Sequence, residues 1–394
     1  MIKLRNSVLF LAGIILAGCQ KPYAPTVVAT NGNYLVVEGY INAGTDSTFI
    51  TLSRTVVVNA KTTANPETKA IVTVEDSQNK TYSLIETPKG IYVAAPLHLD
   101  VTKQYRVRIK TSNGNTYLSD FVAANVSPPI DSVGFKIIPA GMQIYANTHD
   151  PSNNTRYYRY TFKETWQFHA KYNAGYITNG AAIVPRNASQ QIFNCFGTDN
   201  SSITIINSTA ALSQDVAYQV PITYIDPASE KIETKYSILL TQYALTKDAY
   251  VFWENLKKNT EDLGSIFDAQ PSQLIGNIHN IANANEPVIG YMSAGITQQK
   301  RIFISRQDLP GSWLTGYPYN CSLDTAFFFN PFTKQNEVTA ILVPVNSTAI
   351  PIDQFFNIYL SNVVSMTPLG YLYADPECAD CTIRGSKTTP SYWK

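Results

Sequence analysis

The first third of the chain is a series of short β-forming runs, and this pattern constrains the fold more than any other feature. Apolar and polar side chains alternate within the runs, as expected for strands with one buried face. The seven runs span residues 34–41, 48–53, 70–75, 81–85, 91–94, 105–110 and 116–121, and turn-forming residues lie between them. Their number and spacing predict an immunoglobulin-like β-sandwich over residues 34–127. The consecutive Pro128 and Pro129 then favour an extended exit.

The remainder, residues 128–394, is predicted to be a larger β-rich domain. Further strands are expected at 134–138, 157–166, 190–194, 202–206, 216–222, 235–240, 288–292, 301–305 and 340–344. The 25 tyrosines and 17 phenylalanines, together with only 15% charged residues, favour a mainly β fold for the whole chain.

One α-helix is expected in this domain, at about residues 246–263. Thr246 can cap its amino-terminal end, and Gly264 provides a stop. Apolar residues recur on one side of the helix, which should pack on a sheet: Ala249, Phe252, Trp253 and Leu256. The segment 264–280 is interrupted by Gly, Pro and Asn, so it is expected to run as an ordered loop.

The predicted strand 157–166 has two contrasting faces. One face carries Tyr158, Tyr160, Phe162, Glu164 and Trp166, and the other carries Tyr157, Arg159, Thr161, Lys163 and Thr165. An aromatic face is typical of sheet core, because Tyr and Trp pack well on pleated surfaces. The alternative is a platform for a ligand or partner, for which Tyr158, Tyr160 and Trp166 are the candidates.

The amino-terminal segment 1–18 has the layout of a secretory signal peptide. Lys3 and Arg5 form a short basic head, residues 8–16 are apolar, and two small residues precede Cys19. The apolar run is far shorter than the roughly 20 residues that a helix needs to cross a bilayer. The LAGC sequence at 16–19 resembles the bacterial lipobox, in which the cysteine sulfur receives diacylglycerol. Cys19 is therefore predicted to be lipidated.

Lipidation at Cys19 would anchor the mature chain, since two or more acyl chains hold a protein stably at a bilayer. Residues 19–33 contain this cysteine and a stretch rich in Pro, Thr, Ala and Asn, which is predicted to be a tether. The alternative is a chance cysteine after an uncleaved apolar segment. No later apolar run is long enough to span a membrane, so the lipid is the predicted anchor.

The net charge argues against nucleic acid as a partner. Removing residues 1–18 leaves 394 − 18 = 376 residues, and the loss of Lys3 and Arg5 takes the formal charge from +1 to −1. A chain this close to neutrality has no overall electrostatic attraction for a phosphate backbone.

Four cysteines remain after lipidation, and an even number in an exported chain favours disulfides. The possible pairings are Cys195–Cys321 with Cys378–Cys381, Cys195–Cys378 with Cys321–Cys381, or Cys195–Cys381 with Cys321–Cys378. A bond within the CxxC would close a very small loop and add little stability, so long-range bonds that tie the carboxyl tail to the body are favoured. A tetrathiolate zinc site is the alternative, although the second CxxC that it usually needs is missing.

No motif predicts a catalytic residue, a metal ligand or a cofactor. The four histidines, at 98, 149, 169 and 279, are far apart, and none belongs to an HExxH pattern. His149 and Asp150 are adjacent, but residues 147–154 read as a polar turn. The sequence also lacks GxSxG, phosphate-loop and GxGxxG motifs. A pair of glycosidase carboxylates needs no fixed spacing, so a hydrolase stays among the alternatives.

The carboxyl tail ends on an exposed-looking aromatic pair, Tyr392 and Trp393. Trp393 could fill a pocket on a partner, as buried Trp side chains often do at interfaces. The favoured interpretation is structural: disulfides hold the tail, and Trp393 packs into the chain's own core.

Five stretches together resemble the domain of unknown function (DUF) 4249 family. They are LAGC at 16–19, YLVVEGYI at 34–41, residues 235–278, PVIGYMSAG at 287–295 and CADCTIRGSKTTPSYWK at 378–394. By this resemblance, recurring positions of the family are occupied by Cys195, Cys378, Cys381, Arg384, Gly385 and Trp393. The family often has a glycine pair and a Phe-Trp ending, where this chain has Gly385-Ser386 and Tyr392-Trp393.

The resemblance implies a Bacteroidetes envelope lipoprotein, often encoded beside a SusC-like TonB-dependent transporter, and implies no established reaction. The leading hypothesis is a non-catalytic outer-membrane accessory subunit of such a transporter, which captures substrate, caps the barrel or stabilises the complex. The alternatives are a stand-alone surface protein that binds a glycan or peptide, and an envelope hydrolase. Asp is absent directly after Cys19, which favours the outer membrane, with the cell surface preferred over the periplasmic face.

Overall fold

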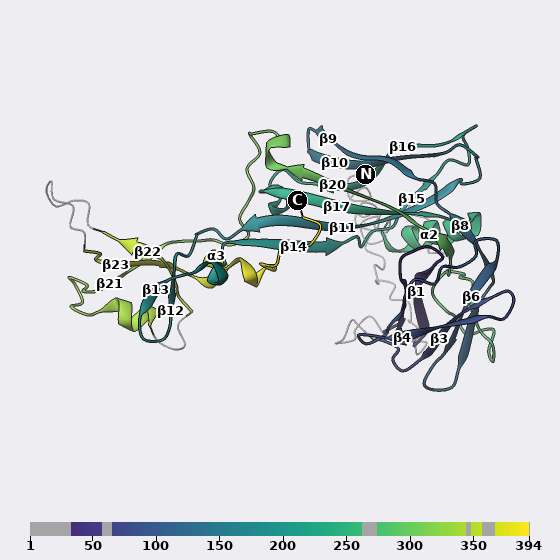
Figure 1. Cartoon of the computed structure of the whole chain (residues 1–394), viewed down its shortest axis with the longest axis horizontal. Helices are drawn as coiled ribbons and strands as arrows, with labels where there is room; N and C mark the ends of the chain where they lie inside the picture. Colours follow the sequence, from purple (N-terminus) through teal and green to yellow (C-terminus); the bar gives the residue numbers. More distant parts are fainter. Residues whose placement is uncertain (1–32, 57–64, 262–273, 344–347, 357–366, 394) are drawn as a thin grey trace, which may run out of the picture.

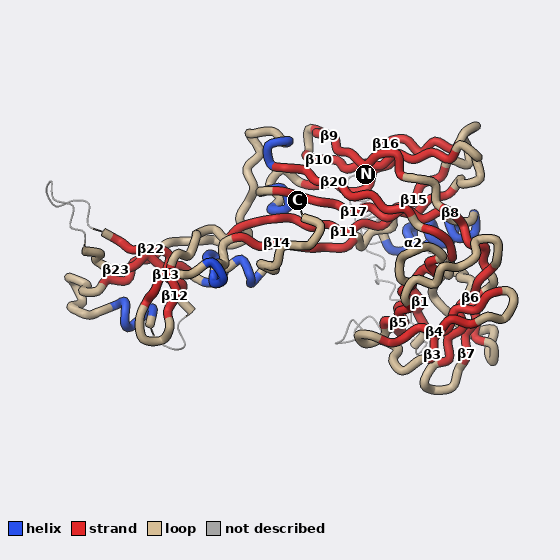
Figure 2. Tube along the Cα trace, in the orientation of Figure 1, coloured by secondary structure: helices blue, strands red, loops and turns tan. Residues whose placement is uncertain are grey.

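The computed structural model describes residues 33–56, 65–261, 274–343, 348–356 and 367–393. Strands make up 46% and helices 11%, which confirms a mainly β protein. Three parts follow one another along the long axis of the molecule (Figure 1). A barrel lies at one end, two packed sheets lie in the middle, and a small sheet lies at the other end, as the strand colouring of Figure 2 also shows.

The amino-terminal strands close into an eight-stranded barrel. The strand order is β6-β3-β4-β5-β2-β1-β19-β8, and β8 pairs back with β6. The strands are β1 (Leu35–Asn42), β2 (Thr48–Arg54), β3 (Ile71–Asp76), β4 (Thr81–Glu86), β5 (Ile91–Ala94), β6 (Gln104–Lys110), β8 (Val122–Val126) and β19 (Ala294–Ile296). From β6, the sheet continues into β7 (Thr116–Ser119) and β18 (Ile278–Asn280).

All seven strands predicted for this region are present, but the immunoglobulin-like sandwich is not confirmed. Its two sheets would have free edges, whereas here the gap between β1 and β8 is filled by β19, which is parallel to both. Gly295 makes this fit possible. Its φ is +151°, and a Cβ at this position would overlap the backbone oxygen of Asn125 on β8.

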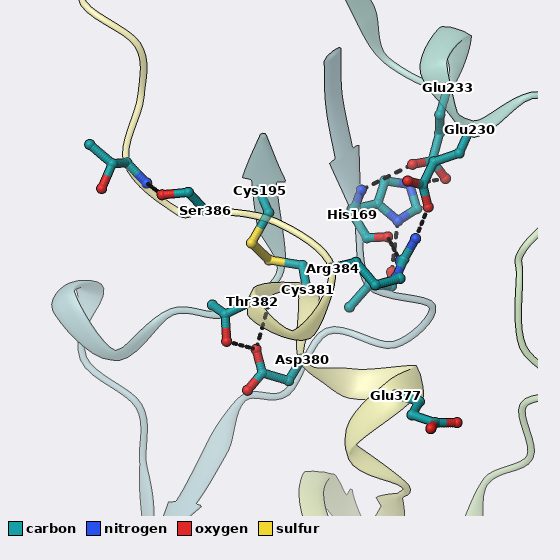
Figure 3. Close-up of a disulfide and its surroundings, with 12 residues drawn as sticks. His169, Cys195, Glu230, Glu233, Glu377, Asp380, Cys381, Thr382, Arg384 and Ser386 are labelled. Atoms are coloured by element: carbon teal, nitrogen blue, oxygen red, sulfur yellow. Dashed lines mark hydrogen bonds and ion pairs between the residues drawn. A yellow bond between two sulfur atoms is a disulfide. The ribbon is translucent and has the colours of Figure 1, made fainter. Parts of the chain in front are cut away.

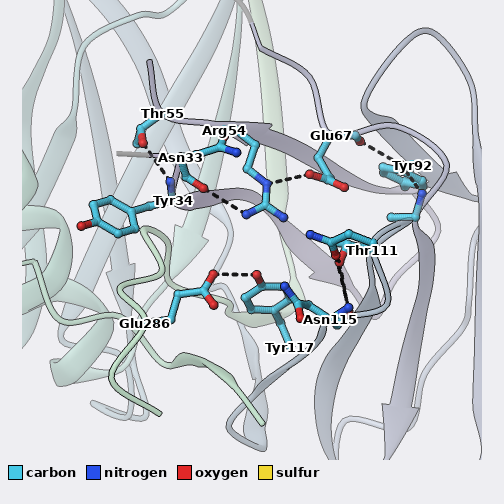
Figure 4. A network of polar contacts seen from close by, with 12 residues as sticks. Asn33, Tyr34, Arg54, Thr55, Glu67, Tyr92, Thr111, Asn115, Tyr117 and Glu286 are labelled. Carbon is cyan, nitrogen blue, oxygen red and sulfur yellow. Dashed lines mark hydrogen bonds and ion pairs between the residues drawn. The ribbon is translucent and has the colours of Figure 1, made fainter. Parts of the chain in front are cut away.

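A polar network fixes the entry into the barrel (Figure 4). The Nε of Arg54 donates to Glu67 at 2.6 Å, and Nη1 donates to the Asn33 carbonyl at 3.1 Å. The Tyr117 hydroxyl donates to Glu286 at 2.6 Å, so the segment before β19 is held on the same side. These bonds thereby join both the start of β1 and the segment that precedes β19 to one side of the barrel.

The middle of the molecule contains two packed sheets (Figure 1). One has the order β16-β10-β9 and the other the order β14-β11-β17-β20, with β15 also on β11. The strands are β9 (Ile130–Ile138), β10 (Gly141–Asp150), β11 (Tyr157–His169), β14 (Asn194–Asn200), β15 (Ile205–Ser208), β16 (Asp215–Ile225), β17 (Lys235–Ala244) and β20 (Gln298–Ser305). Their shared core includes Ile144, Tyr158, Tyr160, Ile222 and Tyr236.

The link between the barrel and this central part is tied to β17. Gln242 is fully buried, and its Nε2 donates to the Pro128 carbonyl at 2.8 Å and to the Ser127 hydroxyl at 3.0 Å. The extended exit expected at the two prolines is therefore held against the sheet by a side chain from a distant strand.

The expected helix is confirmed as α2 (Lys247–Thr260). The Thr246 side chain accepts from the Ala249 N–H, which is the capping interaction that the sequence predicts. Ala249 and Phe252 are buried, so the predicted side does pack on the body. Gly264 and the rest of 262–273 lie outside the described residues. Within the described ranges, no helix has the length and apolar character needed to cross a membrane.

The distal part is a small sheet with the order β21-β23-β22, beside the hairpin β12-β13 (Figure 1). Its elements are β12 (Tyr176–Thr178), β13 (Ile183–Pro185), β21 (Asp324–Phe327), β22 (Ile350–Phe355), β23 (Gly370–Ala374) and the short helix α3 (Pro376–Ala379). Separate small clusters of apolar side chains form its core.

Three strand predictions are wrong. Of the run predicted as a strand at 340–344, residues 340–342 belong to a π-helical turn, Val338–Leu342, whose end residues are both buried, and residue 344 lies outside the described residues. Residues 288–292 form no strand, because only Ile289 makes an isolated bridge, to Val36. In the run at 190–194, the first residue ends a 3₁₀ turn, Ala188–Gln190, the last begins β14, and residues 191–193 form no strand.

Candidate functional site

A cleft of about 950 Å³ lies where the barrel meets the central sheet. Its walls come from β1 and β2 of the barrel, from β11, β17 and the start of β20, and from α2, which Figure 1 shows at this junction. The volume falls in the range of about 300–1,000 Å³ that is usual for small-ligand sites. Such sites commonly lie between two parts of a molecule, and this one needs both parts to be complete.

Strand alternation on β11 places Arg159 and Thr161 in the cleft. Tyr158 and Tyr160 point to the opposite side, where both are 0% exposed in the core between the two sheets. The next strand contributes Thr241 and Tyr243 to the cleft by the same alternation. The floor is therefore the face of the central sheet that does not pack against β9, β10 and β16.

The guanidinium of Arg159 lies on aromatic rings and has no polar protein partner. Its Cζ is 3.8 Å from the centroid of the Trp253 ring and 5.3 Å from that of Tyr243. It makes neither a hydrogen bond nor an ion pair with any residue that the structure describes. Burial lowers the pKa of Arg159, and the nearby Tyr243 and Glu38 offset this only in part. Five N–H donors thus face the cleft without a protein acceptor.

A second unpaired polar group, the Tyr40 hydroxyl, lies on the barrel side of the cleft. The Tyr40 ring meets Tyr243 edge-on, with centroids 5.0 Å apart and an interplanar angle of 72°. Its hydroxyl is buried and has no hydrogen-bond partner among the described residues. Burial raises the pKa of this hydroxyl, so it stays protonated and can donate.

Carboxylates outnumber cations around the cleft. The charged lining residues are Glu38, Asp46, Arg159 and Glu261, which sum to −2 at neutral pH. The Oε1 of Glu261 accepts from the Thr204 N–H at 2.6 Å, whereas Glu38 is exposed and forms no ion pair with a described residue. The cleft thus combines one guanidinium group, that of Arg159, on its floor with carboxylate groups around it.

This arrangement can bind a polar ligand that also has an apolar part, such as the face of a ring or an apolar side chain. The aromatic side chains of Tyr40, Phe49, Tyr243, Trp253 and Tyr291 supply apolar wall. Hydroxyl and amide groups from Thr161, Thr241 and Gln299 supply polar contacts on the floor. Unpaired donors with exposed aromatic surface are characteristic of a binding site.

The disulfides lie away from this cleft. Cys195 pairs with Cys381 (Figure 3), and Cys321 pairs with Cys378. This is one of the two long-range pairings that the sequence left open, and it ties the carboxyl tail to the body as expected. All four thiols are consumed in these bonds, so they do not form the alternative zinc site.

The carboxyl tail packs its aromatic residues on the chain itself. Trp393 meets Phe196 and Phe303 edge-on, with centroid distances of 5.0 and 5.5 Å. The Tyr392 hydroxyl lies 2.8 Å from the Thr165 hydroxyl, and the Arg301 guanidinium lies over the Tyr392 ring at 3.7 Å. These contacts support the structural interpretation of Trp393 over the docking interpretation.

Arg384 provides a contrast to Arg159 (Figure 3). Its guanidinium also stacks on rings, 4.5 Å from the centroid of Phe168 and 4.8 Å from that of Tyr317. Unlike Arg159, it forms an ion pair with Glu230 and donates to the His169 carbonyl at 3.3 Å. Two of its three nitrogens, Nη1 and Nη2, therefore have partners within the protein, and only its buried Nε has none.

The other sequence candidates occupy structural positions. Tyr158 donates to the buried carboxylate of Asp215, and Tyr160 is fully buried, so neither is open to a ligand. Trp166 is partly buried, donates from Nε1 to Glu230 at 3.3 Å, and lies against Gly197, where a larger residue would overlap it. The aromatic face of β11 is sheet core, and the cleft lies on the opposite face.

The polar turn predicted at 147–154 is confined to the residues after Asp150, because His149 and Asp150 are the last two residues of strand β10 and pair with β16. The Nδ1 of His149 lies 2.7 Å from Asp131 on β9, in an exposed position. Asp150 accepts backbone N–H groups from residues 152, 154 and 155 within the turn. Cys19 and most of the tether, residues 20–32, lie outside the described residues.

The cleft was missed because its residues come from five separate regions of sequence, at 36–51, 159–161, 201–204, 241–261 and 289–299. One signal was present: Arg159 and Thr161 alternate with two fully buried tyrosines, so they had to face a second surface of the same strand. The partners of that surface, Tyr40 and Trp253, could be identified only once the barrel and α2 were placed.

Comparison with known protein families identifies the family of this chain. No curated protein matches the chain. The family model for a domain of unknown function, DUF4249, matches residues 20–301. The matched region contains every residue that lines the cleft, whereas the disulfide-linked tail from Cys378 onward lies beyond it. The chain belongs to the DUF4249 family.

Proposed function

We propose that this chain is a non-catalytic outer-membrane lipoprotein that captures a ligand in the cleft and serves as an accessory subunit of a SusC-like TonB-dependent transporter. The observation that carries the capture role is the guanidinium of Arg159, which lies on Trp253 in the cleft and donates a hydrogen bond to no residue that the structure describes. The predicted lipid at Cys19 supports the membrane location, and the resemblance of the family to transporter-associated lipoproteins supports the partner.

The energetics favour a bound acceptor over an empty cleft. A desolvated donor without an acceptor costs about 1–3 kcal/mol, and more when the group is charged. A ligand oxygen on the buried Tyr40 hydroxyl would recover that free energy, and one placed on the partly buried Arg159 would gain a charge-assisted hydrogen bond. A neighbouring ligand ring could in addition cover the aromatic wall.

A stand-alone surface binding protein is the second candidate. It is supported by the lining of the cleft, which already offers a cation, aromatic rings and polar groups to a ligand. The two candidates differ in the partner, not in the cleft.

Purification from native membranes distinguishes them. The chain is tagged at its carboxyl end and expressed from its own promoter, and the detergent-solubilised complex is analysed by mass spectrometry. The transporter role predicts a TonB-dependent barrel in near-stoichiometric amount. A Cys19→Ser variant is the control, because it should lose both acylation and the barrel. Recovery of the acylated chain with no such barrel would leave the stand-alone role.

Orientation and catalysis are tested separately. Protease treatment of intact cells should cleave the chain if it faces the outside, as proposed, and should cleave it only after lysis if it faces the periplasm. Any captured ligand should be recovered chemically unchanged after incubation with the purified protein. Conversion to hydrolysis products would contradict the non-catalytic role.

A further inference from the structure

We propose that the ligand of the cleft is a short peptide with a free carboxyl terminus, bound with its terminal carboxylate on Arg159 and with a cationic group near Glu38. This inference rests on the proposed capture function and specifies its ligand. It is carried by three features of the cleft: the unpaired guanidinium, the surplus of carboxylates and the mixed polar and aromatic walls.

The guanidinium favours a carboxylate. Its planar fork can donate two parallel hydrogen bonds to the two oxygens of one carboxylate, which neutral hydroxyl groups do not match. Trp253 and Tyr243 lie next to the guanidinium, and no described residue accepts a hydrogen bond from it, so its N–H groups remain available to a ligand. Arg384, in a comparable aromatic setting, already uses its edge for Glu230.

The surrounding charge limits how acidic the ligand can be. With Arg159 neutralised by one carboxylate, the lining still carries Glu38, Asp46 and Glu261. A ligand with several anionic groups, such as an acidic glycan, would meet repulsion from these side chains. A peptide carries a single terminal carboxylate with an ammonium group or a basic side chain, so both ends meet a group of opposite charge.

The walls also suit a peptide. The hydroxyl groups of Thr161 and Thr241 and the amide of Gln299 line the floor beside Arg159, where they can pair with peptide N–H and C=O groups. The aromatic residues Phe49 and Tyr291 border the same space and can cover apolar peptide side chains.

Native mass spectrometry and calorimetry on the full-length, detergent-solubilised protein test the proposal. The probes are a library of tetrapeptides with free carboxyl termini, the same library amidated at that end, digalacturonic acid and cellobiose. The free-carboxyl peptides should bind, and amidation should weaken the bound members by about 10- to 100-fold, as expected for loss of a charge-assisted pair.

Two matched arginine variants locate the effect. Arg159→Met should lower the affinity for a selected peptide by the same factor. In this variant, amidation of the peptide should lower the affinity no further. Arg301→Met is the control, because Arg301 also stacks on an aromatic ring, at 3.7 Å from the Tyr392 centroid, but lies outside the cleft. It should leave affinity unchanged. Glu38→Gln should weaken peptides with a free amino terminus more than acetylated ones.

The outcomes separate this inference from the proposed function. Equal binding of free and amidated peptides, or equal losses in the two arginine variants, would overturn it. Binding of digalacturonic acid or cellobiose in place of peptides would also overturn it, while leaving capture in the cleft intact. If no probe binds but the transporter co-purifies, the peptide inference fails. The chain would then remain an accessory subunit that caps the barrel or stabilises the complex.

Discussion

Cys195 and Cys381 are joined by a disulfide although 186 residues separate them in the sequence. The bond connects β14 of the central sheet to the segment that follows α3, and the tail beyond it returns across the sheet to place Trp393 on Phe196 and Phe303. A bond that closes so long a loop restricts the unfolded chain strongly.

Replacing both cysteines of this bond by serine should lower the free energy of unfolding by about 2–5 kcal/mol. It should also release the tail, so that trypsin cleaves after Arg384 and Lys387 faster than in the parent protein. The Cys321→Ser/Cys378→Ser pair is the control, since it opens a loop of 57 residues but leaves Cys381 in place. Denaturant titration and timed proteolysis measure both effects. Equal rates of tail cleavage in the two variants would contradict the role of the Cys195–Cys381 bond in holding the carboxyl tail.

Asp150 should contribute an acid-sensitive part of the stability. Burial alone would raise its pKa, but hydrogen bonds from Ser152, Thr155 and Asn154 outweigh burial and lower the pKa from 3.8 to about 2. A lowered pKa in the folded state stabilises the protein above pH 3.8, and this contribution is lost as the pH falls toward 2. Asp150→Asn should therefore cost about 1–2 kcal/mol at pH 6.

The pH dependence is the informative part of this prediction. The difference in unfolding free energy between the parent and Asp150→Asn should shrink toward zero near pH 2, measured by urea titration at several pH values. The exposed Asp46, which makes no hydrogen bond with a described residue, supplies a control. Asp46→Asn should change stability little at any of these pH values. A constant difference for Asp150→Asn would contradict the role of its carboxylate.

Gly295→Ala should prevent proper closure of the barrel. The added methyl group would overlap the Asn125 carbonyl on β8 and the Tyr40 hydroxyl on β1, at a φ of +151°. We expect a loss of more than about 3 kcal/mol, or failure to fold. Gly114→Ala is the matched control, since Gly114 also has a positive φ, +91°, but has open space around it. It should cost only about 1 kcal/mol, as measured by thermal unfolding. Equal costs would show that close approach is unimportant.

Gln242→Ala should loosen the link between barrel and central sheet. The substitution leaves the Pro128 carbonyl and the Ser127 hydroxyl without the Nε2 donor that they share, at a cost of about 2–4 kcal/mol. Hydrogen exchange at the Ser127 amide, which donates to the Ile296 carbonyl, should become faster. Gln143→Ala removes an amide within the sheet β16-β10-β9 and should leave that exchange rate unchanged. Unaltered exchange in Gln242→Ala would contradict a linking role.

Local features of the fold could be predicted from the sequence, because they depend on neighbouring residues. Strand alternation located seven of the eight strands before residue 127 and missed only β8, and the capping of α2 by Thr246 follows from one residue and its position. The apolar run at 340–344 was misread, since a short apolar segment fits a strand or a helical turn equally well and only its contacts decide.

Long-range features could not be predicted in the same way. Closure of the barrel depends on β19, and nothing within residues 34–127 indicates that three residues near 295 will fill the gap. The cleft depends on the same placement, because Tyr40, Arg159 and Trp253 come together only after the barrel docks on the central sheet. The cysteines narrowed the disulfides to three pairings, and spatial proximity selected one.

The position of β19 late in the sequence sets the order in which the chain can fold as it is synthesised. β1 and β8 keep open hydrogen-bonding edges until residues 294–296 follow. Exposed strand edges are sites of misassembly, so this interval calls for protection by chaperones. Dividing the chain between residues 127 and 128 would consequently separate β19 from the rest of the barrel, so neither fragment would contain a whole barrel.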